Sequence, residues 1–446
     1  MKIRKNGMPT MKVLSMGFAL IILTGACLLC LPAASRDGGS EPFINALFTA
    51  TSATCVTGLI IADTYQNWTM FGQIIILALI QIGGLGFMTI GMYVAVILKK
   101  KIGLKERESI HESVSTLEVA GVVRLVRFII RWTFLIELAG AVFLSIRFIP
   151  SRGLLKGIYY GIFHSISAFC NAGFDLMGDE EMYSSFVNYE GDVIINLTIM
   201  ALIVIGGLGF IVWDDIRRNK LHFKKYMLHS KIVITTTMAL ILGGAILFAI
   251  FENDNLFADM TVKEKILGSL FSSVTPRTAG FNTVDSAGLS NASKLLTMLL
   301  MFIGGSSGST AGGIKTTSFF VAVCFAGATI RRTQGANKFG RRLDEEAIRK
   351  ANAVIIINLS LALTAAAVIF AIQPLPFEDV MFEVFSAIGT VGMSTGITRE
   401  LYDISKILII ALMYFGRLGS LSFALMFAQR KIIPPVQLPV EKIVVG

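Results

Sequence analysis

Charged residues are scarce in this sequence. Only 16% of its 446 residues are Asp, Glu, Lys or Arg, and 54% are hydrophobic, whereas soluble domains carry about 25% charge. The charges fall in short stretches between long apolar runs. Apolar runs of about 20 residues cross the roughly 30 Å hydrocarbon core of a bilayer as helices. The composition therefore excludes a sizeable soluble domain and predicts an all-α polytopic membrane protein.

Cysteine and histidine are also few, with five and four copies. Cys27 and Cys30 form a C-x-x-C pair, but this pair lies in an apolar run, no second pair follows, and no H-E-x-x-H pattern occurs. These absences argue against a redox or metal site. No constellation of catalytic residues stands out, so we expect neither an enzyme nor a cofactor bound to this chain.

The net charge of +10 comes mainly from basic loops. Lys and Arg concentrate at both termini and in segments 99–131, 214–231 and 331–350, whereas the intervening loops carry acids such as Asp179 and Glu252. Cytoplasmic loops of membrane proteins are enriched in basic residues. We therefore place both termini in the cytoplasm and expect contact with membrane lipids rather than with nucleic acid.

Two glycine motifs occur four times in the same order. The first motif reads S-A-T-C-V-T-G-L from Ser52, S-A-F-C-N-A-G-F from Ser167, V-T-P-R-T-A-G-F from Val274 and S-A-I-G-T-V-G-M from Ser386. The second motif reads Q-I-G-G-L-G-F at Gln81, V-I-G-G-L-G-F at Val204, F-I-G-G-S-S-G at Phe302 and Y-F-G-R-L-G-S at Tyr414. A linked pair of motifs that recurs at intervals of 107–115 residues indicates four copies of one unit.

Each unit is predicted to be a helix, a re-entrant loop and a second helix. The leading helices are expected at 12–33, 126–149, 231–251 and 352–373, and the trailing helices at 69–98, 192–213, 293–330 with a break, and 405–429. Segments such as 43–53 and 158–170 are too short to cross and are predicted to re-enter from outside. The N-terminal apolar run is longer than a signal-peptide core, so we take it as the first spanning helix.

The expected architecture is thus eight transmembrane helices and four pore loops with pseudo-fourfold symmetry. The predicted divisions are repeat 1 at 1–100, repeat 2 at 101–218, repeat 3 at 219–335, repeat 4 at 336–430 and a cytoplasmic tail at 431–446.

The four loops are expected to meet around a central pore. Non-helical backbone at membrane depth persists where it lines a watery cavity, and rings of backbone carbonyls replace the hydration shell of K⁺ in selective filters. Glycine accepts the backbone angles that such a loop needs. The predicted filter residues are Val56, Thr57, Gly58, Asn171, Ala172, Gly173, Thr278, Ala279, Gly280, Thr390, Val391 and Gly392.

Two features of these loops allow other interpretations. The glycines could serve only close helix packing, although packing does not explain their fixed linkage to short helices. Arg277 stands three residues before Gly280, and a cation on the axis would repel K⁺. We therefore expect its side chain to lie behind the filter and to donate to loop carbonyls.

With these motifs, the sequence resembles the Trk/Ktr/HKT superfamily of K⁺ transporters, and most of all the KtrB-type membrane subunits of bacterial Ktr systems. The resemblance implies K⁺ uptake across the bacterial plasma membrane by a homodimer with one pore in each protomer. It also implies a cytoplasmic, nucleotide-binding ring of the KtrA type. Gly58 resembles the residue of K⁺-selective members, since Na⁺-selective relatives carry serine there. No loop has the full T-V-G-Y-G sequence of tetrameric channels, so we expect a shorter filter.

The third trailing segment is rich in glycine and is the predicted gate. The family carries a mobile intramembrane loop at this place, and Arg417 adds a charge at membrane depth, where a charge is costly and marks function. The predicted gate residues are Gly304, Gly305, Ser306, Ser307, Gly308, Ser309, Thr310, Ala311, Gly312, Gly313, Lys315 and Arg417. An ion pair between Arg417 and Glu137 is the alternative. A phosphate loop is not expected, because Ile314 separates Gly313 from Lys315.

A Na⁺- or H⁺-coupled secondary transporter, acting by symport, is the alternative function. Such folds use inverted repeats and carboxylates at the midplane. Here the repeats run parallel and intramembrane carboxylates are nearly absent, which favours a pore.

Overall fold

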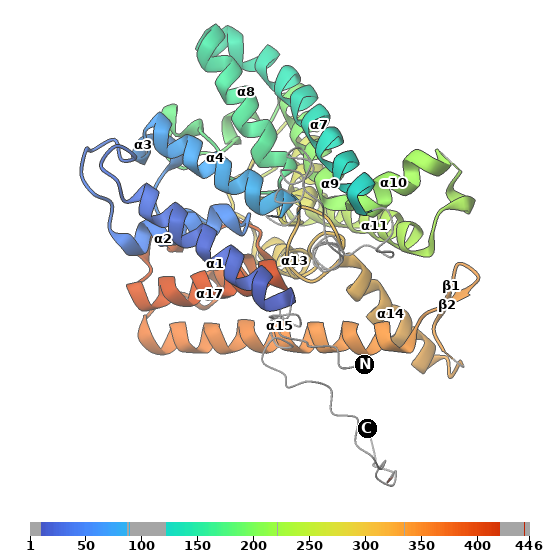
Figure 1. Cartoon of the computed structure of the whole chain (residues 1–446). Helices are drawn as coiled ribbons and strands as arrows, with labels where there is room; N and C mark the ends of the chain where they lie inside the picture. Colours follow the sequence, from blue (N-terminus) through green and yellow to red (C-terminus); the bar gives the residue numbers. More distant parts are fainter. Residues whose placement is uncertain are drawn as a thin grey trace, which may run out of the picture.

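The computed structural model describes residues 10–86, 89, 122–220, 222–333, 335–419 and 441. These residues are mostly helical, with one short two-stranded hairpin, and the helices follow one another in four groups (Figure 1). The first two groups are α1 (Thr10–Leu29), α2 (Phe43–Thr54), α3 (Thr64–Asn67) and α4 (Met70–Leu85), then α7 (Val122–Arg152), α8 (Leu154–Phe169), η1 (Met177–Asp179), η2 (Val187–Tyr189), α9 (Val193–Leu208) and α10 (Phe210–Asn219).

The third and fourth groups repeat this order of long, short and trailing helices. They comprise η3 (Phe223–Lys225), α11 (Leu228–Phe251), α12 (Val262–Val274), α13 (Asn291–Phe302) and α14 (Thr316–Ile330), then the hairpin β1 (Asn337–Lys338) and β2 (Arg341–Arg342), and then α15 (Glu345–Ile372), α16 (Phe377–Gly389), η4 (Ile397–Glu400) and α17 (Asp403–Leu418). The fold is therefore the predicted all-α arrangement of four related units.

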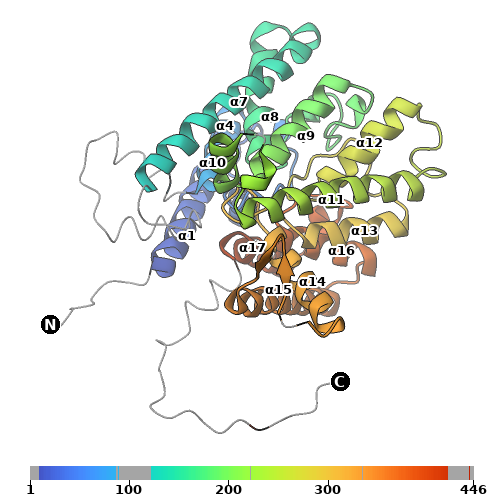
Figure 2. The ribbon, with the colours of Figure 1, turned by 90° about the vertical axis from the view of Figure 1, so that its right-hand side faces the viewer.

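The four leading helices are long and apolar enough to cross a membrane. The qualifying spans are Lys12–Leu29, Val123–Arg152, Leu228–Phe251 and Glu345–Ile372. Their outer faces are apolar, as Leu242 and Ile246 on α11 illustrate with exposed fractions of 51% and 60%. An exposed apolar face of this kind suits lipid rather than water. Figure 2 shows α12, α11, α13 and α16 one below another along one side of the molecule.

The four short helices point their buried C-terminal ends at the centre of the molecule. They contain 12 to 16 residues, too few to cross a bilayer. The last five residues of α2 and the last three of α8 are buried. The negative end of each helix dipole therefore lies in the interior.

The trailing helices differ from the prediction, because each is interrupted and not only the third. We predicted continuous helices over 69–98, 192–213 and 405–429, but α4, α9 and α17 end at Leu85, Leu208 and Leu418. The glycine after each adopts a positive φ, +79° at Gly86, +95° at Gly209 and +86° at Gly419. Glycine accepts this conformation and ends a helix. At Gly209 the axis turns by 94° into α10.

Close packing explains the first glycine of the second motif. A Cβ on Gly83, Gly206 or Gly416 would overlap the carbonyl oxygen of Thr54, Phe169 or Ile388, respectively. These three carbonyls occupy the same position, four residues before the glycine of the first motif. In units 1, 2 and 4, each trailing helix therefore lies directly against the end of its own short helix.

Candidate functional site: a ring of four loops

The four loops after the short helices share one backbone conformation. The first-motif glycines have positive φ, at +94°, +71°, +79° and +93° for Gly58, Gly173, Gly280 and Gly392. Two residues earlier, each loop also has a positive φ at a residue with a side chain, namely Val56, Asn171, Thr278 and Thr390. Residues with a Cβ rarely adopt this conformation, and it costs roughly 1–3 kcal/mol where it persists. The same strained geometry, built four times, indicates a functional constraint.

The loops meet around a single axis. A Cβ placed on Gly58 would lie 2.5 Å from Ala172 O, and one on Gly173 would lie 2.7 Å from Ala279 O. A Cβ on Gly280 would lie 2.5 Å from Val391 O.

The ring closes at the fourth glycine. A Cβ on Gly392 would overlap Thr57 O and lie 2.8 Å from Gly58 Cα. Each glycine thus faces the carbonyl of the residue before the next glycine, in the order of units 1, 2, 3 and 4. The structure therefore brings together the twelve residues predicted for the filter.

Hydroxyl groups at the ends of the short helices hold the loops in place. Ser52 Oγ accepts from Gly58 N at 3.0 Å, and Ser386 Oγ accepts from Gly392 N at 3.1 Å. In unit 2, Ser167 Oγ donates to Phe174 O at 2.7 Å. These anchors were not predicted, although a serine stands six residues before the glycine in three copies of the motif.

Unit 3 keeps the anchor with a different residue. Thr275 Oγ1 donates to Phe281 O at 2.6 Å. Thr275 stands one position later in the motif than the serines of the other units, so the function of the hydroxyl is retained while its position shifts.

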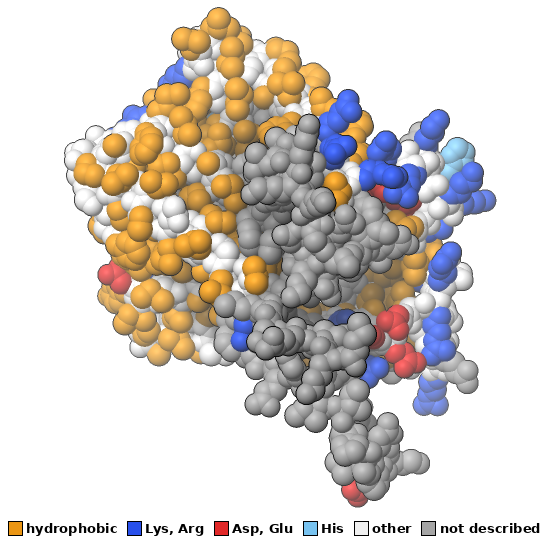
Figure 3. Space-filling view, in the orientation of Figure 1, with side chains coloured by type: hydrophobic (Ala, Val, Ile, Leu, Met, Phe, Trp, Pro, Cys, Tyr) orange, Lys and Arg blue, Asp and Glu red, His pale blue; other side chains and the backbone are white. Residues whose placement is uncertain are grey.

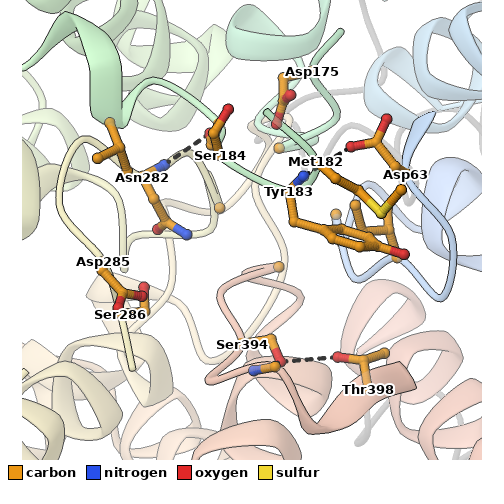
Figure 4. Close-up of a pocket in the computed structure, with 18 of the residues that line it drawn as sticks. Asp63, Asp175, Met182, Tyr183, Ser184, Asn282, Asp285, Ser286, Ser394 and Thr398 are labelled. Atoms are coloured by element: carbon orange, nitrogen blue, oxygen red, sulfur yellow. Dashed lines mark hydrogen bonds between the residues drawn. The ribbon is translucent and has the colours of Figure 1, made fainter. Parts of the chain in front are cut away.

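A cavity opens on one side of the ring. Its walls include the four first-motif glycines together with polar side chains from all four units (Figure 4). Four acidic residues contribute to this lining, namely Asp63, Asp175, Glu181 and Asp285. Burial, together with the nearby carboxylates of Asp63 and Asp179, raises the pKa of Asp175 to about 7, although the hydrogen bond from Met177 N to Asp175 Oδ1, at 3.0 Å, opposes this shift.

On the other side of the ring, residues 303–315 form a loop between α13 and α14. Thr310 Oγ1 donates to Phe169 O at 3.1 Å and lies 3.3 Å from Asn171 Oδ1, at the base of the second filter loop. In addition, Ser306 N donates to Gly207 O at 3.0 Å. The predicted gate loop is therefore packed directly against the ring loop and the trailing helix of unit 2.

The tip of this loop also contacts the start of α10. Phe210 N donates to Gly308 O at 2.8 Å, and a Cβ on Gly209 would lie 2.8 Å from Ser307 O. The bend at Gly209 thus gives the loop a backbone partner.

Arg417, which belongs to unit 4, connects this loop of unit 3 to unit 1. Its guanidinium donates to Thr310 O and to Gly83 O, and to Gly84 O at 3.0 Å. The alternative ion pair with Glu137 is not formed, since Glu137 instead accepts from Gln81 Nε2 at 3.0 Å. Arg417 therefore ties the end of α17 to both the gate loop and α4.

Two further cations, Lys315 and Arg277, donate to backbone or hydroxyl oxygens. Lys315 Nζ donates to Ala311 O at 2.8 Å, within the loop itself. The Arg277 guanidinium points away from the ring and lies 3.4 Å from Thr237 O on α11. Arg277 thus turns toward α11 and donates to a helix carbonyl, which corrects the predicted partner, a loop carbonyl.

Comparison with known proteins adds independent information. Residues 15–434 match the sequence profile of the family described as TrkH, cation transport protein. The chain is 42% identical over 452 residues to the potassium/sodium uptake protein NtpJ of Enterococcus hirae, covering 100% of this chain and 99% of that protein. It is 41% identical over 420 residues to the Ktr system potassium uptake protein B of Bacillus subtilis, covering 94% and 93%. The potassium transporter TrkH from Vibrio parahaemolyticus has the same fold, with a TM-score of 0.74 at 18% identity over 96% of this chain and 86% of that one.

Proposed function

Because the chain belongs to the TrkH family of cation transport proteins, we propose that it takes up K⁺ through a gated pore lined by backbone carbonyls. The observation that carries the proposal is the closed ring of Gly58, Gly173, Gly280 and Gly392, each facing a carbonyl of the next loop. Four helix dipoles with their negative ends toward this ring favour a cation at its centre. Carbonyl oxygens can replace the hydration shell of K⁺.

Two threonines of the filter support the same reading. In the described part of the chain, the hydroxyls of Thr57 and Thr390 are buried and have no hydrogen-bond partner. A buried polar group without a partner costs free energy. An ion or water on the axis would satisfy both groups.

The test is ⁸⁶Rb⁺ uptake into proteoliposomes that hold the purified protein. We expect uptake driven by membrane potential alone, with K⁺ competing more strongly than Na⁺ or Li⁺. Since one relative is a potassium/sodium uptake protein, the assay is repeated with and without a Na⁺ gradient and with and without a H⁺ gradient. A strict requirement for either gradient would favour coupled symport, and absence of Rb⁺ uptake would refute the proposed function.

The loop 304–315 and Arg417 are proposed to close the pore beneath the filter. The loop lies against the base of the second filter loop through Thr310, and the positive charge of Arg417 repels cations on the axis. The guanidinium holds Thr310 and Gly83, from two different units, at the same time. Release of this contact would free the loop to leave the pathway.

A cytoplasmic partner is proposed to control this gate. Basic side chains gather on the side of the molecule where α10 and the β1–β2 hairpin lie (Figure 3). The short helix η3, which follows α10, meets the hairpin through Phe223 and Phe339, whose ring centroids are 6.4 Å apart. The basic residues there include Arg217, Lys220, Lys224, Lys338 and Arg341.

This basic surface supports the proposed orientation, with both termini in the cytoplasm of a bacterial cell. We infer a docking face for a nucleotide-binding ring of the KtrA type, on a homodimer of this chain. Lys105 and Arg107 of the basic segment 99–131 would extend this docking face, and the apolar end of the tail 434–446 would pack on a partner chain. These residues, except Glu441, lie outside the described part of the chain.

The raised pKa of Asp175 predicts that uptake depends on external pH. Above about pH 7 the carboxylate is ionised and attracts cations to the outer cavity, whereas below this pH it is neutral. We therefore expect Rb⁺ uptake at low Rb⁺ concentration to fall by roughly two- to fivefold as the external pH drops from 8 to 6. Asp175→Asn should remove most of this dependence.

The matched control for this prediction is Asp254→Asn, at an exposed acidic residue of another outer loop. This variant should keep the pH profile of the unaltered protein. If Asp175→Asn also keeps that profile, Asp175 does not set the local charge.

A further inference from the structure

The residue nine positions before each filter glycine lies on a short helix beside the filter. These four residues are Thr49, His164, Phe271 and Glu383, and all four are buried. The side chains of His164 and Glu383 are long and polar enough to form hydrogen bonds with the segment that follows the filter glycine. Glu383 accepts hydrogen bonds from two side-chain hydroxyls, whereas His164 accepts one from a backbone N–H.

Glu383 binds the outer segment of the fourth loop through both carboxylate oxygens. Its Oε1 accepts from Thr398 Oγ1 at 2.5 Å, and its Oε2 accepts from Ser394 Oγ at 2.7 Å. Ser394 Oγ in turn accepts from Gly396 N at 2.9 Å. The carboxylate therefore links α16 to Ser394 and Thr398, at the two ends of the segment 394–398.

No ordinary structural role accounts for a carboxylate at this place. Glu383 is 1% exposed, and it joins none of the ion pairs formed within the described residues, the nearest of which on α16 is Lys294–Glu378. An unpaired buried carboxylate is costly unless hydrogen bonds compensate for its lost hydration. Within the described residues, the Glu383 carboxylate accepts hydrogen bonds from two hydroxyl groups, those of Ser394 and Thr398. Both of these residues line the cavity above the ring (Figure 4).

His164 makes the equivalent contact in the second unit. Its Nδ1 lies 2.7 Å from Tyr160 O, which can only accept, so Nδ1 carries the proton. Its Nε2 is then free to accept from Leu176 N, at 3.0 Å. Leu176 follows Gly173 by three residues, as Ser394 follows Gly392 by two.

Units 2 and 4 stand opposite each other across the axis. The contacts of the glycines run from Gly58 to Gly173, Gly280, Gly392 and back to Gly58, so Gly173 and Gly392 form one diagonal of the ring. His164 and Glu383 therefore contact the loops of units 2 and 4, which lie opposite each other across the ring.

We propose that Glu383 is a positioning residue for cation selectivity, which fixes the outer end of the fourth filter loop through Ser394 and Thr398. This inference rests on the proposed function, because it assumes that the ring selects the ion. Glu383 acts through the two hydroxyls and does not contact the ion. A loosened fourth loop would let the ring contract around the smaller Na⁺, so selectivity rather than flux alone should change.

The test compares Glu383→Gln and Thr398→Val with Thr398→Ser in the Rb⁺ uptake assay. The amide of Gln accepts at only one atom, and Val removes one of the two donors at nearly constant volume, whereas Ser keeps the hydroxyl. We expect the ratio of Na⁺ to K⁺ concentrations that halve Rb⁺ uptake to fall about fivefold for Glu383→Gln and Thr398→Val. Thr398→Ser should keep the ratio of the unaltered protein. Combining Glu383→Gln with Thr398→Val should lower the ratio little more than either change alone, because both changes break the same contact.

Glu378→Gln is the control, since Glu378 is on the same helix with a side chain 47% exposed. A purely structural role of Glu383 would lower the amount of folded protein without changing the concentration ratio, and that result would overturn the inference. If Glu383→Gln does not reach the membrane, the concentration ratio of Thr398→Val alone tests the inference. Absence of Rb⁺ uptake by the unaltered protein would instead refute the proposed function.

Discussion

Gly280→Ala is expected to lower Rb⁺ uptake by about tenfold or more. Gly280 has a φ of +79°, and a Cβ there would lie 2.5 Å from Val391 O and 3.2 Å from Gly392 Cα. Positive φ costs a residue with a side chain roughly 1–2 kcal/mol, and the Cβ can be accommodated only if the neighbouring loop moves. Since 1.4 kcal/mol corresponds to about a factor of ten, even a modest loss of filter geometry gives this effect.

The matched control is Gly243→Ala on α11. A Cβ at Gly243 would meet nothing within 4 Å, and alanine favours a helix over glycine. This variant should transport as the unaltered protein does. Full transport by Gly280→Ala, with normal protein in the membrane, would contradict the assignment of the ring as the filter.

Arg417→Ala is expected to raise Rb⁺ uptake by about tenfold. The substitution removes the contacts with Thr310, Gly83 and Gly84, and hydrogen bonds from a charged donor contribute about 1.5–3 kcal/mol each. It also removes a positive charge from beneath the filter. Both changes favour an open pathway.

Arg417→Lys separates the two contributions. Lysine keeps the charge but lacks the planar group that reaches several carbonyls at once. An increase in both variants would assign the closure to the hydrogen bonds, and an increase only in Arg417→Ala would assign it to the charge. Unchanged or lower uptake in Arg417→Ala, at normal expression, would count against the gate.

The repeated motifs predicted more of this molecule than the hydropathy did. Four glycines at intervals of 107–115 residues led to the four-unit fold and to twelve loop residues that the structure brings to one axis. The motif marks these loops because each of them has a positive φ at the same position, and glycine accepts this backbone conformation. Such a requirement is local, so it leaves a visible mark in the sequence.

The errors concerned the ends of the trailing helices and the partner of Arg417. The breaks at Gly86, Gly209 and Gly419 were missed, because an isolated glycine in an apolar run costs only about 1 kcal/mol and does not by itself end a helix. At Gly209 the break is accompanied by contacts with the gate loop of another unit. The partners of Arg417 could not be predicted either, because they depend on how units 1, 3 and 4 lie relative to one another.

The sequence by itself determined the membrane location, the four units and the residues of the ring, since hydropathy and backbone conformation are properties of short segments. Only the tertiary structure decided which carbonyls Arg417 holds, that Arg277 turns toward α11, and that Glu383 binds the exit of the fourth loop. These are contacts between segments far apart in the chain or on different elements. Their energies depend on distance and on exclusion of water, which a linear pattern of residues does not specify.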